Sequence, residues 1–313
     1  MKCFLGISHR IDLDSVILKN SILNPIYCGA IYKTEESLIM RDNTGDNISK
    51  ERNSLGELTV QYWIWKNISA DYYGLCHYRR YFAFGSINGK RNEQNQIYLA
   101  YLSKKNIKKY KLNDEKIIEN ICSEYDVVIP EGADVTKITT QYGKVKTVEE
   151  LWLAHKNIFF DEKIFNDLTM VIKNKYPEFY KTYNEYFNSK YHIGYNCYIM
   201  KKELFYDLSK LQFGIINTLK NECGEKEYYK LYPRTYGYIG EMIFGCYVYN
   251  LKKNYNVKEL PLVFFEITDD NIFNKNVVKG IFRFYAKYMI DILFPKNTFI
   301  RKILKNFYHK FIK

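Results

Sequence analysis

Short apolar runs, each bounded by polar or turn-forming residues, recur along the chain. They lie at residues 2–8, 25–30, 71–76, 125–130, 191–200 and 260–266. Apolar runs of this length between turn residues are typical of buried strands. The run at 25–30 also fits a turn, and the run at 191–200 leads into a helical pattern. The sequence therefore predicts several short buried strands.

Between these runs, apolar residues recur at helical spacing. Leu58, Tyr62 and Trp65 lie at i, i+4 and i+7, which predicts a helix ending near residues 66–67. Ser54 and Glu57 have the spacing of a capping box at its start. Further helices are predicted at residues 113–122, 148–157, 165–173, after Pro177 and from 234–241 onward, with loops at 44–47 and 88–96. A helix that leads into a buried strand favours a parallel or mixed sheet. The expected fold class is α/β, an open, mostly parallel mixed sheet flanked by helices.

Length and composition allow one large α/β domain, with or without a helical appendage. The chain has 313 residues, of which 47% are hydrophobic, so global disorder is not expected. Its seven cysteines include no CxxC pair, which favours reduced thiols over disulfides or a zinc site. No secretory leader is recognised. No apolar run approaches the roughly 18 residues that cross a bilayer, so we expect a soluble or peripheral cytoplasmic protein.

The net charge of +12 is concentrated at the C-terminal end. Residues 277–313 contain nine Lys or Arg and one acid, Asp291. Two amphipathic helices separated by Pro295 are predicted there, with aromatic and aliphatic side chains on one side and cations on the other. Such helices suit an anionic membrane interface. A helix pair packed on the domain is the alternative, and nucleic-acid binding ranks lower because the body of the chain lacks a recognisable nucleic-acid module. We expect domains at 1–270 and 277–313, with an anionic membrane and no nucleic acid as partner.

Several common catalytic motifs are absent from the sequence. A Walker loop, GxGxxG, HExxH and GxSxG are not found, which disfavours P-loop ATPases, Rossmann dehydrogenases, zinc proteases of that type and serine hydrolases. Asp12 and Asp14 form a DxD, a pattern that can hold a divalent cation against a diphosphate. Because this pair directly follows the first strand, we expect a solvated loop instead.

The stretch His77-Tyr78-Arg79-Arg80 ends a predicted buried strand. Donors at the carboxyl end of a strand in an open α/β sheet commonly hold an anionic ligand. The planar guanidinium group makes two charge-assisted hydrogen bonds to a phosphate at once. Arg79 and Arg80 could thus replace the charge of a metal ion at a diphosphate. The alternative is a structural ion-pair cluster with only one arginine directed inward.

Several segments together carry a resemblance to a known family. They are residues 46–49, 56–59, 62–67 and 74–82, the last containing HYRRYF, together with His9, residues 125–126, His155, residues 195–201 and residues 234–241. With them the chain resembles, over residues 2–265, a bacterial family largely described as a domain of unknown function. Its members occur in capsular, exopolysaccharide and O-antigen gene clusters and look like glycosyltransferases of GT-A-like fold. The C-terminal tail lies outside the resemblance.

The resemblance implies roles for individual residues. The donor and its diphosphate would be bound by His9, Arg10, Asp46, Asn47, His77, Tyr78, Arg79 and Arg80, and the acceptor by His192, Asn196 and Arg234. Glu241 and His77 would be catalytic, with Glu241 as base near a helix N-terminus, although that dipole lowers its pKa and a capping role is the alternative. His192 could equally be structural, and His155 is expected in the core. No metal ligand is assigned, and Mn²⁺ or Mg²⁺ remains an alternative to the arginine pair.

The expected function follows from that resemblance. It is transfer of a hexose, galactose or similar, from a UDP-sugar to a lipid-linked or oligosaccharide acceptor in bacterial surface polysaccharide synthesis. The enzyme would lie peripherally on the inner face of the cytoplasmic membrane. A non-catalytic, membrane-associated binding protein of a polysaccharide assembly complex is the alternative.

Overall fold

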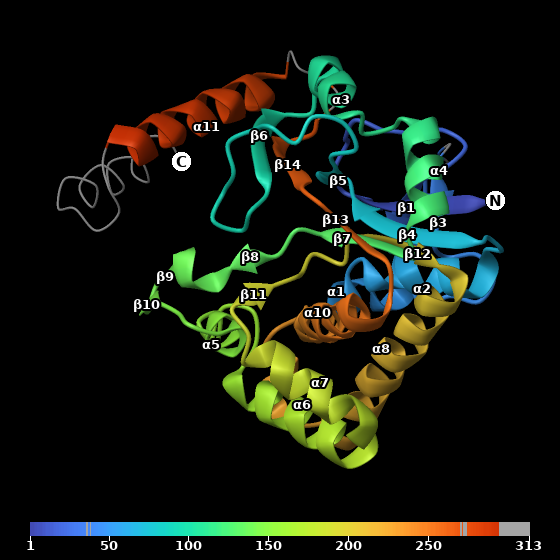
Figure 1. Cartoon of the computed structure of the whole chain (residues 1–313), viewed down its shortest axis with the longest axis vertical. Coiled ribbons are helices and arrows are strands. Elements are labelled where there is room, and N and C mark those ends of the chain that lie inside the picture. Colours follow the sequence, from blue (N-terminus) through green and yellow to red (C-terminus); the bar gives the residue numbers. More distant parts are fainter. Residues whose placement is uncertain (36, 38, 270, 272–273, 294–313) are drawn as a thin grey trace.

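A mixed sheet between two layers of helices forms the centre of the molecule (Figure 1). The computed structural model describes residues 1–35, 37, 39–269, 271 and 274–293. Within them the sheet has the order β13-β7-β12-β4-β1-β2-β3, with β5, β6 and β14 attached beside it. Its parallel pairs are β4–β1, β1–β2, β2–β3, β13–β7 and β14–β6, whereas β12 and β5 run antiparallel to their neighbours. The predicted α/β class and mostly parallel mixed sheet are confirmed.

Several strands of this sheet coincide with the apolar runs of the sequence, whereas the strands at residues 40–41, 97–101 and 257–260 were not predicted. The strands of the sheet are β1 (Cys3–Arg10), β2 (Leu23–Cys28), β3 (Met40–Arg41), β4 (Tyr72–His77), β5 (Arg80–Phe82), β6 (Ile97–Tyr101), β7 (Val127–Pro130), β12 (Tyr198–Lys201), β13 (Val257–Leu260) and β14 (Leu262–Ile267). Two-stranded pairs are formed by β8 (Ala133–Asp134) with β11 (Tyr191–His192) and by β9 (Thr139–Thr140) with β10 (Gly143–Lys144). The predicted run at 191–200 is therefore two strands separated by a tight turn.

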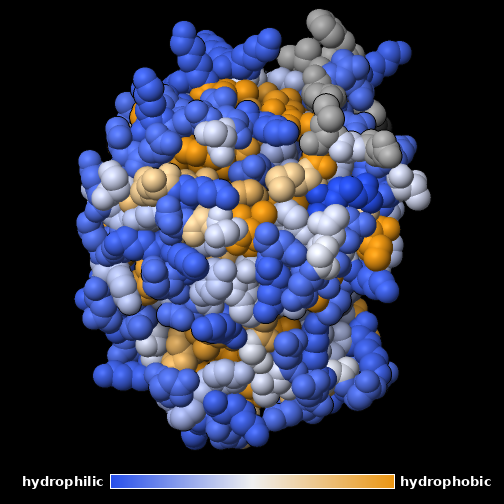
Figure 2. All heavy atoms as spheres, turned by 90° about the vertical axis from the view of Figure 1, so that its right-hand side faces the viewer, coloured by the Kyte–Doolittle hydropathy of each residue, from blue (hydrophilic) through white to orange (hydrophobic). Residues whose placement is uncertain are grey.

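Helices cover both faces of the sheet. They are α1 (Arg52–Leu55), α2 (Leu58–Asn67), α3 (Lys104–Tyr110), α4 (Glu115–Glu124), α5 (Val148–Leu153), α6 (Glu162–Lys175), α7 (Pro177–Phe187), α8 (Lys202–Cys223), α9 (Glu227–Lys230), α10 (Thr235–Asn254) and α11 (Lys275–Leu293). In Figure 1, α4 lies above the sheet, α2, α8 and α10 lie below it, and α6 and α7 lie beyond α10. The face on the right of Figure 1 is covered mainly by hydrophilic residues (Figure 2).

Three clusters of buried apolar side chains pack between these layers. One joins α4 to β1, β4 and the β5–β6–β14 strands, and a second joins the opposite face of the sheet to α2, α8 and α10. A third unites α5, α6, α7, α8 and α10 beneath the sheet. Tyr186, Phe187 and Trp152 belong to this last core. It carries much of the aromatic excess of the sequence and holds α5 and α10 beside the sheet edge.

The predicted capping box at Ser54 and Glu57 is wrong. Ser54 lies inside α1, and Gly56 interrupts the chain before α2 with φ 58° and ψ −132°, a conformation that favours glycine. Glu57 precedes α2 but makes no side-chain capping bond. Its carboxylate is buried and bonded to Asn196 and Arg234 instead. The Glu57 carboxylate therefore binds Arg234 and does not cap the start of α2.

The predicted first tail helix corresponds to α11, which packs against β6 and β14. The second, predicted beyond Pro295, lies outside the described residues. Within the described part of the chain, no helix combines the length and apolarity that a bilayer crossing requires. The division into domains at 1–270 and 277–313 stays a prediction.

Candidate functional site

A cavity of about 1050 Å³ opens where three parallel strands end. Ser8 and Arg10 of β1, Cys28 of β2 and His77 of β4 line it from the sheet. Strand β1 lies between β2 and β4. After β1 the chain forms β2 on one side of it and later forms β4 on its other side. Such a reversal of strand order leaves a crevice at the carboxyl edge of an open α/β sheet, where ligands bind. The loop before β6, α5 and the start of α10 complete the walls.

The turn between β4 and β5 places two arginines on the cavity wall. Arg80 is the first residue of β5, and it pairs with His77 of β4 in the antiparallel register. The Arg80 guanidinium lies 4.7 Å from the ring centre of Phe264 and 4.9 Å from that of Tyr195, and Arg79 lies 5.2 Å from Phe264. Aromatic faces therefore support both cations. Arg80 Nε is buried without a hydrogen-bond partner in the described part of the chain, which leaves donor capacity for an anion.

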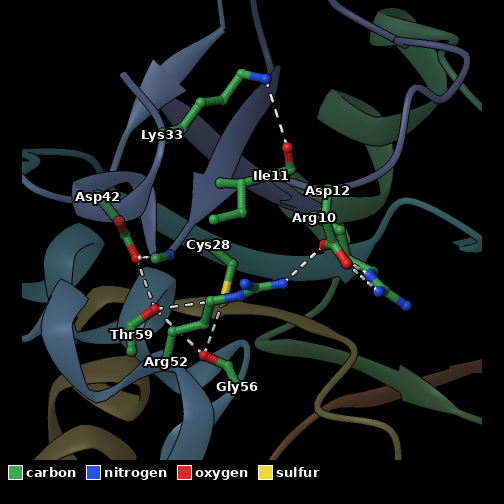
Figure 3. A network of polar contacts seen from close by, with 10 residues as sticks. Arg10, Ile11, Asp12, Cys28, Lys33, Asp42, Arg52, Gly56 and Thr59 are labelled. Carbon is green, nitrogen blue, oxygen red and sulfur yellow. Dashed lines mark hydrogen bonds and ion pairs between the residues drawn. The ribbon is translucent and has the colours of Figure 1, made fainter. Parts of the chain in front are cut away.

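A second group of cations lies at the end of β1 (Figure 3). Arg10 Nε donates to Asp12 Oδ1 at 3.1 Å, and Arg52 Nη2 donates to the same oxygen at 2.8 Å. Arg10 Nη2 also donates to Asp12 Oδ2. Hydrogen bonding from Arg10, aided by the charge of Arg52, lowers the pKa of Asp12 to about 2. Both arginines also line the cavity. Asp12 and Asp14 lie in an exposed loop after β1, as expected, and the Asp12 carboxylate in addition bridges two guanidinium groups.

Glu57 is a buried carboxylate that lines the cavity. Its Oε1 accepts from Asn196 Nδ2 at 3.0 Å, and its Oε2 accepts from Arg234 Nη2 at 3.1 Å. Burial opposes ionisation of this carboxyl, but the charge that His77 carries when protonated, the charge of Arg234 and the Asn196 hydrogen bond outweigh it, so the pKa of Glu57 is lowered. Glu57 is therefore an anion at neutral pH. It neutralises part of an otherwise strongly cationic cavity.

Glu241 reaches the same cavity from α10. It is the seventh residue of that helix, so it lies in the second turn rather than at the N-terminus. The close approach of α10 to α1 depends on Gly237, where an added Cβ would come within 3.1 Å of the Leu55 carbonyl oxygen. Burial raises the pKa of Glu241, while the hydrogen bond from the Tyr195 N–H partly opposes the shift. The expectation that the helix dipole lowers this pKa is wrong, because desolvation dominates two turns into the helix.

A strained turn connects these groups. Tyr195 and Asn196 both have positive φ, 75° and 44°, a conformation that costs energy for residues other than glycine. The Tyr195 N–H donates to Glu241 Oε1 at 2.9 Å, and the Tyr195 carbonyl accepts from His77 Nε2 at 2.6 Å. A carbonyl only accepts, so His77 carries its proton on Nε2. Burial lowers the pKa of His77 to about 4, and it is neutral at pH 7.

The other end of the cavity is aromatic. His155 stacks on Phe159 at 5.1 Å between ring centres, Phe159 stacks on Tyr238 at 4.7 Å, and Arg234 lies 5.7 Å from the Tyr238 ring. His192 lies edge-on to Trp152 and contacts the Tyr186 hydroxyl at 3.1 Å. Burial lowers the pKa of His192 to about 4 and lowers that of His155. His155 lines the cavity instead of being confined to the core as expected.

The structure brings together most, but not all, of the residues that the sequence singles out. Arg10, His77, Tyr78, Arg79, Arg80, His192, Arg234 and Glu241 line one cavity. His9, Asp46, Asn47 and Asn196 are not among its lining residues. Side chains alternate along a strand, and His9 is buried on the other side of β1, 2.9 Å from Ser15 Oγ.

The remaining three residues hold backbone or side-chain partners elsewhere. The exposed Asp46 accepts from the Tyr62 hydroxyl at 3.2 Å, and Asn47 donates to the Gly45 carbonyl. Asn196 is fully buried and bonded to Glu57. Asn196 therefore positions Glu57 and does not reach an acceptor itself.

Sequence reasoning did not assign Glu57, Arg52, Tyr195, Trp152 or Tyr238 to the site. The signal available for Glu57 was its position in the 56–59 segment of the family resemblance, which the capping-box interpretation obscured. The fit to a divalent cation is poor in the described residues. No three His, Cys, Asp or Glu side chains gather there as ligands, and Glu57 and Asp12 are both engaged by arginines.

Comparisons with known proteins agree with this architecture. A family model described as a domain of unknown function, DUF4422, matches residues 7–254. No curated protein matches the chain. The solved apo structure of the bifunctional glycosyltransferase WbbM aligns with a TM-score of 0.73 and 24% identity, over 86% of this chain. The match spans 46% of WbbM, about half of its length. This likeness shows a shared fold, and HYRRYF as a family signature stays a prediction.

Proposed function

The chain belongs to the DUF4422 family, and from that premise we propose that it is a glycosyltransferase. It transfers a hexose of the galactose type from a UDP-sugar to a lipid-linked or oligosaccharide acceptor in the synthesis of a bacterial surface polysaccharide. The shared fold with WbbM, a bifunctional glycosyltransferase, supports the reaction class. The donor, the acceptor and the pathway rest on the family resemblance and on the chemistry of the cavity.

The observation that carries the proposal is the position of Arg79 and Arg80. Both guanidinium groups lie on aromatic faces at the carboxyl edge of the parallel strands and line the cavity. Arg10 and Arg52 line the same cavity from β1 and α1. A nucleoside diphosphate would find several planar, charge-assisted donors there. As the bond to the sugar breaks, these preorganised cations stabilise the negative charge that develops on the leaving diphosphate.

Glu241 is the proposed general base. Its raised pKa makes its carboxylate a stronger proton acceptor than an exposed glutamate. It would take the proton of the acceptor hydroxyl that attacks the anomeric carbon. His77 already uses its Nε2–H on the Tyr195 carbonyl. We assign His77 a positioning role, since Tyr195 in turn holds Glu241.

The test is binding and turnover of a panel of UDP-sugars by the purified full chain. We expect UDP to bind, and one UDP-hexose to be consumed with UDP release that increases when a saccharide acceptor is added. The double variant Arg79→Ala/Arg80→Ala should lose UDP binding. Lys105→Ala, an exposed cation on α3, serves as control. No binding of any UDP compound would overturn the proposal.

Binding without turnover would favour the other candidate, a non-catalytic binding protein of a polysaccharide assembly complex. Glu241→Gln separates the two. A transferase loses turnover in this variant and retains UDP binding, whereas a binding protein has no turnover to lose.

A further inference from the structure

Helix α11 has an inner and an outer face. On the inner face Val277 and Phe284 are buried, and the Phe284 ring lies 4.8 Å from the ring of Tyr98 on β6. Gly280 passes close to Ile267 of β14, where an added Cβ would come within 2.7 Å of the Ile267 side chain. The helix is therefore packed on the body of the protein through one side.

The outer face of α11 is apolar and faces water. Val278, Phe282, Tyr285, Met289 and Leu293 are between 51% and 66% exposed. Their spacing of four, three, four and four residues places them on one stripe along the helix. Such a continuous apolar stripe on an exposed helix marks an interaction surface, whereas isolated exposed apolar residues are ordinary.

Cations accompany this stripe. Residues 275–293 carry four Lys or Arg and one Asp, and Lys275 and Lys279 are exposed. The neighbouring α3 adds four exposed lysines, Lys104, Lys105, Lys108 and Lys109, and contains no acid. The segments that lead into the two helices are hydrogen-bonded, with the Leu102 N–H 3.1 Å from the Ile267 carbonyl and the Tyr101 hydroxyl 2.9 Å from the Asp269 carbonyl.

A row of aromatic contacts ties α11 to the cavity wall. Phe284 contacts Tyr98, the Tyr98 ring lies 5.5 Å from that of Phe264, and Phe264 supports Arg79 and Arg80. Figure 1 shows the start of α11 beside β6 and β14 and the rest of the helix extending away from these strands. Whatever surface α11 binds is thus held in a fixed place relative to the arginine pair.

We propose that the outer face of α11 docks the protein on an anionic membrane surface. The apolar stripe would enter the boundary between head groups and acyl chains, and the lysines of α11 and α3 would contact anionic head groups. A protein partner would explain the stripe but not the excess of cations beside it, four Lys or Arg against one Asp on α11 and four Lys on α3. This inference concerns the surface alone and does not require transferase activity. If the proposed function holds, a lipid-linked acceptor lies in the membrane that α11 binds.

Vesicle flotation of the full chain tests the proposal. The probes are vesicles of phosphatidylcholine alone and of phosphatidylcholine mixed with phosphatidylglycerol. We expect flotation with the anionic vesicles only, and less flotation as salt screens the lysines. Phe282→Ser/Met289→Ser should weaken partitioning by about tenfold or more, because two exposed anchors are lost without disturbing the buried face. Met170→Ser, an equally exposed methionine on α6, is the matched control.

Several outcomes would overturn this inference. They are an absence of flotation, equal flotation with both kinds of vesicle, and undiminished flotation of Phe282→Ser/Met289→Ser. Light scattering addresses a second copy of the chain as the occupant. A dimer that the double variant converts to a monomer, without flotation, would assign the stripe to self-association. UDP binding, measured in parallel, reports on the proposed function separately, because neither substituted residue lines the cavity.

Discussion

The backbone N–H of Tyr195 points at the carboxylate of Glu241, with 2.9 Å between the nitrogen and Oε1. The carbonyl of the same Tyr195 accepts from His77, and the next residue, Asn196, donates to Glu57. One turn therefore links groups from β4, the start of α2, and α10. Its positive φ angles cost energy that these contacts offset, a pattern found where backbone strain is retained for function. Five predictions follow from this arrangement and from the arginines beside it.

Replacing Glu241 with Gln should abolish most turnover. Loss of a general base costs about 10²–10⁴-fold in rate, while UDP binding should stay within about twofold because the diphosphate donors are untouched. The wild-type kcat/KM should rise with pH and level off above the pKa of Glu241, which burial raises. The inflection should therefore lie above about 4.3, the ordinary value for Glu. A variant with wild-type kcat would remove Glu241 from the chemistry.

Glu241→Gln should lower turnover but raise the stability of the fold at neutral pH. Because the folded-state pKa of Glu241 is raised, its contribution is most favourable below the unfolded pKa and is lost as pH rises through the folded pKa. Glu241→Gln avoids that ionisation. Thermal unfolding should show the variant gaining stability over the wild type between acid and neutral pH, and a constant difference would contradict the assignment.

Glu57→Gln should destabilise the protein by about 2 kcal/mol at pH 7, because Arg234 and the cavity lose their buried anion. The pKa of Glu57 is lowered on folding, so its stabilisation exists above the unfolded pKa and is lost as pH falls through the folded value. Urea unfolding should thus show a difference that shrinks below about pH 4. Glu203→Gln, an exposed residue on α8, is the control and should be neutral.

Two variants of Asn196 separate the effect of its hydrogen bond on stability from the effect of its backbone strain. Asn196→Ala loses the bond to Glu57 and keeps a positive φ with a Cβ, whereas Asn196→Gly loses the bond without that strain. Alanine should be less stable than glycine by about 1 kcal/mol, and both should be less stable than the wild type. Chemical denaturation measures this order. If alanine and glycine have equal stability, the turn is not strained at this residue.

UDP binding should survive chelation by EDTA. Arg10, Arg52, Arg79 and Arg80 supply the positive charge at the cavity, and the described residues offer no cluster of metal ligands. Titration calorimetry with and without chelator should give affinities within about threefold, because the charge-assisted donors to the diphosphate are guanidinium groups that the chelator does not remove. Complete loss of binding would instead restore a divalent cation to the mechanism. Asp46, Asp12 and Asp14 would then be the candidate ligands.

Local pattern was sufficient for much of the fold. Apolar runs of strand length predict β1, β4, β7 and β14, and helical spacing predicts α2, α4, α6 and α10, because burial of one face imposes these periods on the sequence. Short or half-buried elements escaped that pattern. The sequence analysis did not anticipate β6, β13 or α3, since few of their residues are buried on a regular period.

The sequence likewise predicts some residues of the candidate site and misses others. Residues next to a strand end, such as Arg10 and the 77–80 stretch, are predictable because the strand itself places them at the sheet edge. Glu57 was assigned to a helix cap that does not form. Its partners Asn196 and Arg234 are 139 and 177 residues away in sequence, a separation at which local spacing carries no information.

By itself, the sequence determined the α/β class, the strand that ends in His77 and two arginines, and the charge of the C-terminal end. These properties depend on residue type and on periods of a few residues. Only the tertiary structure decided that Asp12 bridges two arginines, that Glu57 and Glu241 have pKa shifts of opposite sign, and that α11 exposes its apolar side. The physical reason is desolvation, because burial and distant charges set each of these properties, and both arise only when remote segments pack together.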